Sequence, residues 1–324
     1  MRNLKNLLPL VIAIGVLLGL FTAWIPNFLA VDNMIGLAER ISVNAILAFG
    51  MTLTILIGGI DLSVGAVLAL VGTSTVYILS AGSDPAGGET LQQSIPWMLL
   101  AILAGLGVSA AFGAINGVCA AKTRMPPFII TLATMMVARG FARSFNQGQP
   151  LPVAKHETAF RALGIGKDPL FGAIPVPVLA MIAVFVLAAL LLHRTRFGQH
   201  VYAIGGNREA ARYTGVPLVR TEIGVYLLCS LFAGIAGIIH TASLFSASPV
   251  AGEGYELNAI AAAVVGGTSF TGGIGSMYGT LLGAIIIGII DKGLVQGHVD
   301  PSLQLIVKGL VILVAVFVDV QRRK

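Results

Sequence analysis

Long apolar stretches recur along the whole chain, and they constrain its fold more than any other feature. A helix needs about 20 apolar residues to cross the ~30 Å hydrocarbon core of a membrane. Because only helices and closed barrels satisfy their own backbone hydrogen bonds in lipid, this series predicts a bundle of spanning helices. We therefore predict an all-α, polytopic membrane protein with about ten transmembrane helices, at Leu7–Trp24, Ser42–Gly58, Val64–Ala81, Trp97–Ala121, Pro127–Ala142, Ile174–His193, Ile223–Leu244, Leu257–Gly267, Met277–Leu294 and Leu303–Val320.

The composition supports this interpretation and excludes other classes of protein. Only 10% of the 324 residues are charged, whereas soluble domains carry about 25%. The hydrophobic content of 56% also excludes a disordered chain. The net charge of +6 is a small surplus, and no basic cluster is interleaved with aromatic residues. We therefore expect membrane lipid around the chain and no nucleic-acid partner.

The charges in the loops predict how the chain is oriented in the membrane. The first apolar stretch is long for a secretory signal, so we interpret it as a span that starts in the cytoplasm. Ten crossings then return the C-terminus to the cytoplasmic side. The loops with Lys122 and Arg194 face the cytoplasm in this arrangement, and the loop with Glu253 and Glu256 faces outside. This matches the positive-inside rule and predicts that both termini are cytoplasmic.

One segment on the predicted outer side is basic and breaks that rule. Arg139 lies just before this segment, which carries Arg143, Lys155, Arg161 and Lys167. Two interpretations are open. Loop charge far from the end of a span has little influence on orientation. Alternatively, these arginines form a docking surface for an acidic partner outside the membrane.

Two glycine-rich breaks interrupt the apolar sequence. The first reads GGIDLSVG from Gly58 to Gly65, and the second reads GGTSFTGG from Gly266 to Gly273. Each opens with Gly-Gly and precedes another apolar stretch, so we predict an internal duplication within one transmembrane domain, 1–324, with halves at roughly 35–145 and 223–320. Matching breaks are typical of transporters, because unwound backbone at membrane depth must be satisfied by protein or by a wet cavity. Two ordinary turns in a glycine-rich chain are the alternative.

Side chains that could carry out chemistry are sparse. The sequence contains no HExxH or GxSxG pattern and no GxxxxGK[ST] phosphate loop. We therefore predict that the chain is not an enzyme, that it needs no cofactor or metal, and that it does not hydrolyse ATP itself. Energy for transport must then come from a partner or from an ion.

A few polar residues nevertheless lie within or next to the predicted spans. Asp61 either caps the start of a helix or lines a path, and Asn116 either bonds neighbouring helices or lines that path. We expect Lys308 to form an ion pair with Asp291 or with Asp61, and a contact with the substrate is the alternative. An ion-coupled secondary carrier of a small polar solute is the alternative function. The scarcity of ionisable residues in the spans argues against it, because ion-coupled carriers need them.

The predicted cytoplasmic loop 194–222 contains a short helix with clear end signals. Asn207 is placed to cap a helix over Arg208–Thr214, and Gly215 is placed to end it before Pro217. A well-capped helix in a basic loop is suited to act as a lever for a soluble motor. A surface helix without a partner is the alternative.

Four strings occur in order along the chain: GGIDLSVG, NGVCAAKTRMPPFIITLATMMVARG, TRFGQHVYAIGGNREAARYTGV and GEGYELNAIAAAVVGGTSFTGG. In this combination the chain resembles permease subunits of the ribose-type branch of bacterial ABC sugar importers, nearly end to end. The resemblance implies a bacterial inner-membrane homodimer with a fold similar to the vitamin-B12-type permeases. It also implies a tandem ATP-binding subunit in the cytoplasm, a periplasmic sugar-binding protein, and a path for a monosaccharide, either a ribose-like pentose or a hexose.

The resemblance also implies roles for individual residues. Coupling to the ATP-binding subunit is expected at Gly205, Gly206, Asn207, Glu209, Ala210 and Ala211. The translocation path or its signature breaks are expected at Gly58, Gly59, Asp61, Ser63, Gly65, Asn116, Gly266, Gly267, Thr268 and Ser269. Docking of the binding protein is expected at Arg139, Arg143 and Arg161.

Overall fold

The computed structural model describes residues 7–81, 95–123, 125–155, 157–166 and 174–321. In this part of the chain the fold is all-α, as predicted, apart from one antiparallel pair of two-residue strands. The helices are α1 (Leu8–Trp24), α2 (Val31–Leu56), α3 (Val64–Ser80), α4 (Ile95–Lys122), α5 (Pro127–Ser144), α6 (Thr158–Ile165), α7 (Val176–Arg194), α8 (Arg196–Gly206), α9 (Arg208–Tyr213), α10 (Leu218–Leu244), α11 (Tyr255–Val265), α12 (Met277–Gln296) and α13 (Pro301–Gln321), and the strands are β1 (Leu151–Pro152) and β2 (Ser246–Ala247).

Every predicted apolar stretch lies on a helix. Among the described residues, five helices are long and apolar enough to cross a membrane, namely α2, α4, α7, α10 and α12. The other stretches lie on helices that are shorter or less apolar, so the count of ten spans stays a prediction. Helix α2 begins at Val31, whereas the predicted apolar stretch begins at Ser42. The first turns of the helix carry Asp32, Glu39 and Arg40, which a helix accommodates but a lipid-facing span does not, so the apolar stretch did not include them.

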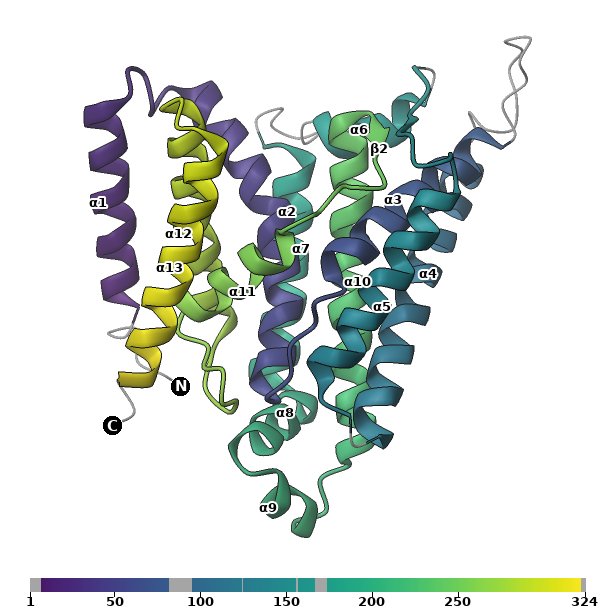
Figure 1. The fold of residues 1–324 in the computed structure, drawn as a ribbon, viewed down its shortest axis with the longest axis vertical. Coiled ribbons are helices and arrows are strands. Elements are labelled where there is room, and N and C mark those ends of the chain that lie inside the picture. The colour runs from purple at the N-terminus through teal and green to yellow at the C-terminus, as the bar shows by residue number, and fades with distance from the viewer. Residues whose placement is uncertain (1–6, 82–94, 124, 156, 167–173, 322–324) are drawn as a thin grey trace. The chain divides into compact units, whose positions relative to one another are not determined.

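The chain divides into two compact units, each built from separate segments (Figure 1). Unit 1 comprises Met1–Gly59, Ala183–Pro217 and Leu257–Lys324, and unit 2 comprises Ile60–Ile182 and Leu218–Glu256. Unit 2 draws segments from both predicted repeat halves, and so does unit 1. The duplication and the single transmembrane domain therefore stay predictions.

Unit 1 is organised around α12, which packs against α2 and α1. Close approach depends on small residues. A side chain at Gly293 would meet the Phe21 ring at 2.3 Å, and one at Gly288 would meet Ile41 at 2.3 Å. A buried hydrogen bond of 2.6 Å joins the hydroxyls of Thr52 and Thr280. Such small and hydroxylated contacts are how helices associate where lipid removes the hydrophobic driving force.

Unit 2 is organised around α10, which packs against α4, α3 and α6. Gly113 and Gly117 lie one turn apart on α4 and bring the two backbones together. An added Cβ would stand 2.8 Å from Leu227 Cα at the first position and 2.7 Å from Ile223 Cα at the second. The β1–β2 pair and α6 lie at the end of unit 2 where α10 ends (Figure 1).

Candidate functional site

The first glycine-rich break begins with a Schellman motif at the end of α2. Gly58 has a φ of +80°, and its N–H donates to the carbonyl oxygen of Ile55 at 2.9 Å. The N–H of the buried Gly59 donates to the carbonyl oxygen of Thr54 at 2.9 Å. The left-handed backbone at Gly58 satisfies the last carbonyls of the helix, which is why a glycine stands there.

The second break begins in the same way at the end of α11. Gly267 has a φ of +88° and donates to the carbonyl oxygen of Val264 at 2.8 Å, and Thr268 donates to that of Ala263 at 2.9 Å. The left-handed residue is therefore the second glycine of this pair, whereas it is the first glycine in the other break. The two breaks match one residue out of step with their sequence pattern. Gly266 directly follows α11, its N–H donates to the Ala262 carbonyl oxygen at 3.0 Å, and an added Cβ there would meet the backbone of α12 at Gly279.

Asp61 organises the start of α3 from a fully buried position. Its Oδ1 accepts hydrogen bonds from the Ser63 backbone N–H at 2.9 Å and from the Ser63 hydroxyl at 2.6 Å. Asn116 on α4 donates to the Ser63 hydroxyl at 3.0 Å and accepts from the Thr134 hydroxyl of α5 at 2.7 Å. Three of the predicted path residues thus meet in one network that joins α3, α4 and α5.

A second polar tie supports this network. The Thr131 hydroxyl of α5 donates to the Ile60 carbonyl oxygen at 3.2 Å and accepts from the Leu62 N–H at 3.1 Å. Sequence reasoning missed Thr131 and Thr134. Their spacing of three residues within an apolar helix, which places both on one face, is the signal that could have found them.

Gly65 marks a close approach between α3 and the segment that leads into α11. A side chain there would lie 2.3 Å from the Gly252 carbonyl oxygen and 2.6 Å from Glu256 Oε2. Arg139 of α5 holds the same segment, because its Nη1 donates to the carbonyl oxygens of Pro249 at 2.8 Å and Ala251 at 2.7 Å. The chain before α11 is therefore fixed by two helices of unit 2.

The three predicted docking arginines have different surroundings. Arg139 is half-buried and bonds backbone carbonyls. The Arg161 guanidinium stacks over the Phe245 ring at 3.9 Å and donates to the Lys155 carbonyl oxygen at 3.4 Å. Arg143 is exposed. Two of the three arginines therefore stabilise local structure, whatever else they do.

The predicted lever helix is present as α9. Asn207 Oδ1 accepts from the Ala210 N–H at 2.9 Å, which is the expected N-cap. Gly215, with a φ of +81°, follows the last turn as expected. Glu209 and Ala210 are exposed, but Ala211 is only 3% exposed. The expectation that both alanines face a partner therefore needs revision, because Ala211 is buried within its own chain.

The remaining predicted coupling and break residues lie close together in unit 1. Gly205, near the end of α8, is packed against backbone, whereas no heavy atom lies within 4 Å of an added Cβ at Gly206. Thr268 and Ser269 are buried in the second break. The Ser269 N–H donates to the Ile274 carbonyl oxygen at 2.8 Å, which closes this break into a compact loop.

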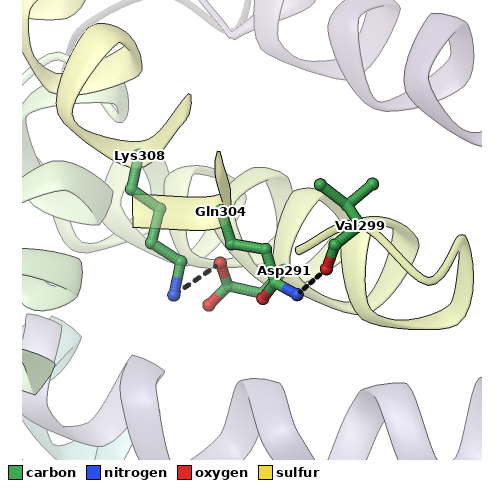
Figure 2. A network of polar contacts seen from close by, with 4 residues as sticks. All are labelled: Asp291, Val299, Gln304 and Lys308. Carbon is green, nitrogen blue, oxygen red and sulfur yellow. Dashed lines mark hydrogen bonds and ion pairs between the residues drawn. The ribbon is translucent and has the colours of Figure 1, made fainter. Parts of the chain in front are cut away.

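An ion pair joins α12 and α13 (Figure 2). Lys308 Nζ lies 3.0 Å from Asp291 Oδ1, and the two side chains are only 27% and 20% exposed. Beside it the Gln304 side chain donates to the Val299 carbonyl oxygen at 2.8 Å. Of the two partners considered for Lys308, the structure selects Asp291.

Comparison with known proteins identifies the family. The family model described as "Branched-chain amino acid transport system / permease component" matches residues 33–316. The chain is 44% identical over 310 residues to the ribose import permease protein RbsC of Escherichia coli K12, covering 95% of this chain and 92% of that protein. It is 43% identical to RbsC of Bacillus subtilis 168, covering 94% and 92%. It is 36% identical to the L-arabinose transport system permease protein AraH of Escherichia coli K12, covering 93% and 86%.

No solved structure gives a significant match. The matched region includes both breaks, the Asp61 network and α9, and it extends from the first turn of α2 into α13. The chain therefore belongs to this family of transport permeases, as the membrane-embedded permease component of an ABC importer and not as its ATP-hydrolysing subunit.

Proposed function

We propose that this chain forms the translocation path for a monosaccharide, with a ribose-like pentose as the first candidate and a hexose as the second. The observation that carries the proposal is the match over nearly the whole chain to permeases whose names specify ribose import and L-arabinose transport. Both sugars are pentoses. The family description names branched-chain amino acids, so these are the competing class of substrate.

The working form is a pair of identical chains in the bacterial inner membrane, each with about ten spans and cytoplasmic termini. A tandem ATP-binding subunit engages the cytoplasmic side, and a periplasmic binding protein delivers the sugar. The fold belongs with the vitamin-B12-type permeases, with the path at the dimer interface. The series of apolar helices supports the spans, and the asymmetry of loop charge supports the orientation. The pairing, the partners and the fold class rest on the resemblance to ABC sugar permeases.

The two breaks shape the path in this proposal. Both end a helix with a left-handed glycine, and both are followed by a serine at the start of the next helix, Ser63 before α3 and Ser276 before α12. Unwound backbone of this kind is tolerated at membrane depth only where protein or a wet cavity satisfies it. The Asp61 network does so for the first break, so Asp61, Ser63 and Asn116 hold the path's wall in place.

Helix α9 makes the contact with the ATP-binding subunit. Support comes from the exposure of Glu209 and Ala210, and from Tyr213, whose side chain is 86% exposed. An exposed aromatic ring on a short helix with a defined start and end is typical of a protein interface, where aromatic residues anchor binding.

Reconstitution in liposomes tests the proposal. The permease is purified with its ATP-binding subunit, and the binding protein, a labelled sugar and internal ATP are supplied. Uptake of ribose, arabinose, one hexose and leucine is measured in parallel. We expect ATP-dependent uptake of ribose. Uptake by the chain alone under a proton or sodium gradient would instead establish the ion-coupled carrier. Uptake of leucine but of no sugar would overturn the proposed substrate class.

A further inference from the structure

We infer that Gly205 is a positioning residue, an internal joint through which a displacement of α9 reaches the second glycine-rich break and the end of α2. The inference rests on the proposed function, because it assumes that α9 receives the movement of an ATP-binding subunit. It differs from the expectation drawn from the sequence, in which Gly205 contacts that subunit directly.

Three backbone segments of unit 1 meet at the carbonyl group of Leu56, the last residue of α2. The Gly273 N–H donates to this oxygen at 2.9 Å. An added Cβ at Gly205 would lie 1.8 Å from the same oxygen and 2.4 Å from the Gly273 nitrogen. No side chain fits between α8, the end of α2 and the second break, so these segments contact one another directly through their backbones.

The facing side of the contact also consists of glycine. Gly272 and Gly273 have φ values of +85° and +72°, a conformation that other residues rarely adopt. An added Cβ at Gly272 would lie 3.0 Å from the Gly205 carbonyl oxygen, and one at Gly273 would lie 2.9 Å from the Gly206 nitrogen. The second break therefore uses two of its glycines to fit against the end of α8.

A hydrogen bond from α8 to the second break also restrains this contact. Tyr202 lies one turn before Gly205 on α8, and its hydroxyl donates to the Gly275 carbonyl oxygen at 2.8 Å. Gly275 directly precedes Ser276, whose hydroxyl caps α12 by accepting from the Gly279 N–H at 3.1 Å. Helix α8 thus holds the second break at two points, immediately before the start of α12.

The link between α8 and α9 is short. Helix α8 ends at Gly206, α9 begins at Arg208, and Asn207 bonds to both, since its N–H donates to the Ala203 carbonyl oxygen at 3.1 Å and its carbonyl oxygen accepts from the Ala211 N–H at 2.9 Å. Because only Asn207 separates the two helices and bonds to both, a displacement of α9 is transmitted to α8. Close-packed elements shift between discrete arrangements and do not deform continuously, so the movement passes to the break.

The experiment compares Gly205→Ala with Gly309→Ala in the full complex in liposomes, with the binding protein present. Gly309 is an exposed helical glycine with no heavy atom within 4 Å of an added Cβ. We expect Gly205→Ala to lower the sugar taken up per ATP hydrolysed by about tenfold, a usual size for coupling between distant sites. The ATP-binding subunit should remain bound and active, and Gly309→Ala should stay within about twofold of the unchanged protein.

Tyr202→Phe keeps the inference testable if Gly205→Ala does not assemble. It removes only the hydroxyl that holds Gly275, and we expect about threefold less uptake per ATP with normal assembly. Unchanged coupling in Tyr202→Phe, or in an assembled Gly205→Ala, would overturn the inference. Failure of the proposed function is a separate result, because the unchanged complex would then import no sugar at all.

Discussion

At the scale of single residues, the two ends of the first break need glycine for different reasons. Gly58 requires a left-handed backbone, while Gly65 requires space for the Gly252 carbonyl oxygen. We predict that Gly65→Ala destabilises the protein by about 3 kcal/mol, because an overpacked contact with backbone cannot relax cheaply. Gly58→Ala should cost about 1 kcal/mol of backbone strain. Thermal unfolding of the purified permease in detergent measures both.

Gly15→Ala is the control for this pair, since no heavy atom lies within 4 Å of an added Cβ at Gly15 in α1. Alanine favours the helix, so the unfolding temperature should stay the same or rise slightly. If Gly65→Ala behaved like Gly15→Ala, the close approach to Gly252 would not exist in the folded protein.

Residue types with a strong local preference could be predicted from the sequence. Asn207 was placed correctly as a cap, because an Asn before a short polar helix has few other roles. The sequence left two roles open for Asn116, because an amide on an apolar helix can bond a neighbour or face a cavity. Its partners Ser63 and Thr134 lie 53 and 18 residues away, and no local rule predicts such pairs.

At the scale of helices, the ion pair between Lys308 and Asp291 fixes how α13 lies on α12. We predict that Asp291→Asn lowers the free energy of unfolding by about 1–3 kcal/mol, because it leaves a poorly hydrated ammonium group without its partner. The exchange Asp291→Lys with Lys308→Asp should recover part of this loss, because a lysine at position 291 regains a partner but also faces Arg40. Unfolding temperatures of the two variants test this, and an exchange as unstable as Asp291→Asn would show that the charges act independently.

Helix α9 provides a second prediction at this scale. Ala211 is buried, so a bulky residue there would disturb the chain itself and reveal nothing about a partner. We predict instead that Ala210→Trp, at an exposed position, weakens binding of the ATP-binding subunit by about tenfold, as expected for a clash near the centre of an interface. Co-purification at graded concentrations measures the affinity.

Ala162→Trp is the matched control, because Ala162 is an exposed alanine on α6, a helix with no predicted contact to the ATP-binding subunit. Equal binding by both variants would mean that α9 is only a surface helix.

Helix ends were predictable where glycine, serine or asparagine marks them, and unpredictable where they depend on distant packing. The sequence predicted both breaks, but it paired them one residue out of step. Which glycine takes the left-handed conformation depends on the environment, and Gly266, which packs against Gly279, has no positive φ. The start of α2 was missed because hydropathy detects the membrane-facing part of a helix and not the polar turns before it.

At the scale of the whole molecule, an all-α membrane protein could be predicted from composition and the recurring apolar stretches, because a lipid environment leaves few alternative folds. The grouping into two units could not be predicted. Each unit assembles segments that are far apart in the sequence, and the chain passes between them four times. The substrate could not be predicted either, because no local motif in the sequence marks the residues that would bind a sugar.

The basic segment on the predicted outer side, with Arg139, Arg143, Lys155 and Arg161, gives the last prediction. Arg143 and Lys155 are exposed, whereas Arg139 and Arg161 are engaged with backbone and with an aromatic ring. Exposed cations act mainly by steering encounter, and each alone contributes about 0–1 kcal/mol. We therefore predict that Arg143→Glu combined with Lys155→Glu slows association with an acidic periplasmic binding protein several-fold and leaves dissociation nearly unchanged. Surface plasmon resonance with the permease in nanodiscs measures both rates.

The salt dependence separates steering from damage. At 1 M salt the Debye length falls to about 3 Å, so the difference in association rate between the double variant and the unchanged permease should nearly vanish. Lys122→Glu combined with Arg220→Glu reverses the same number of positive charges, at exposed positions on the predicted cytoplasmic side. This control should leave association unchanged. If both double variants slowed association equally, net charge alone would control encounter, and the outer segment would carry no docking surface.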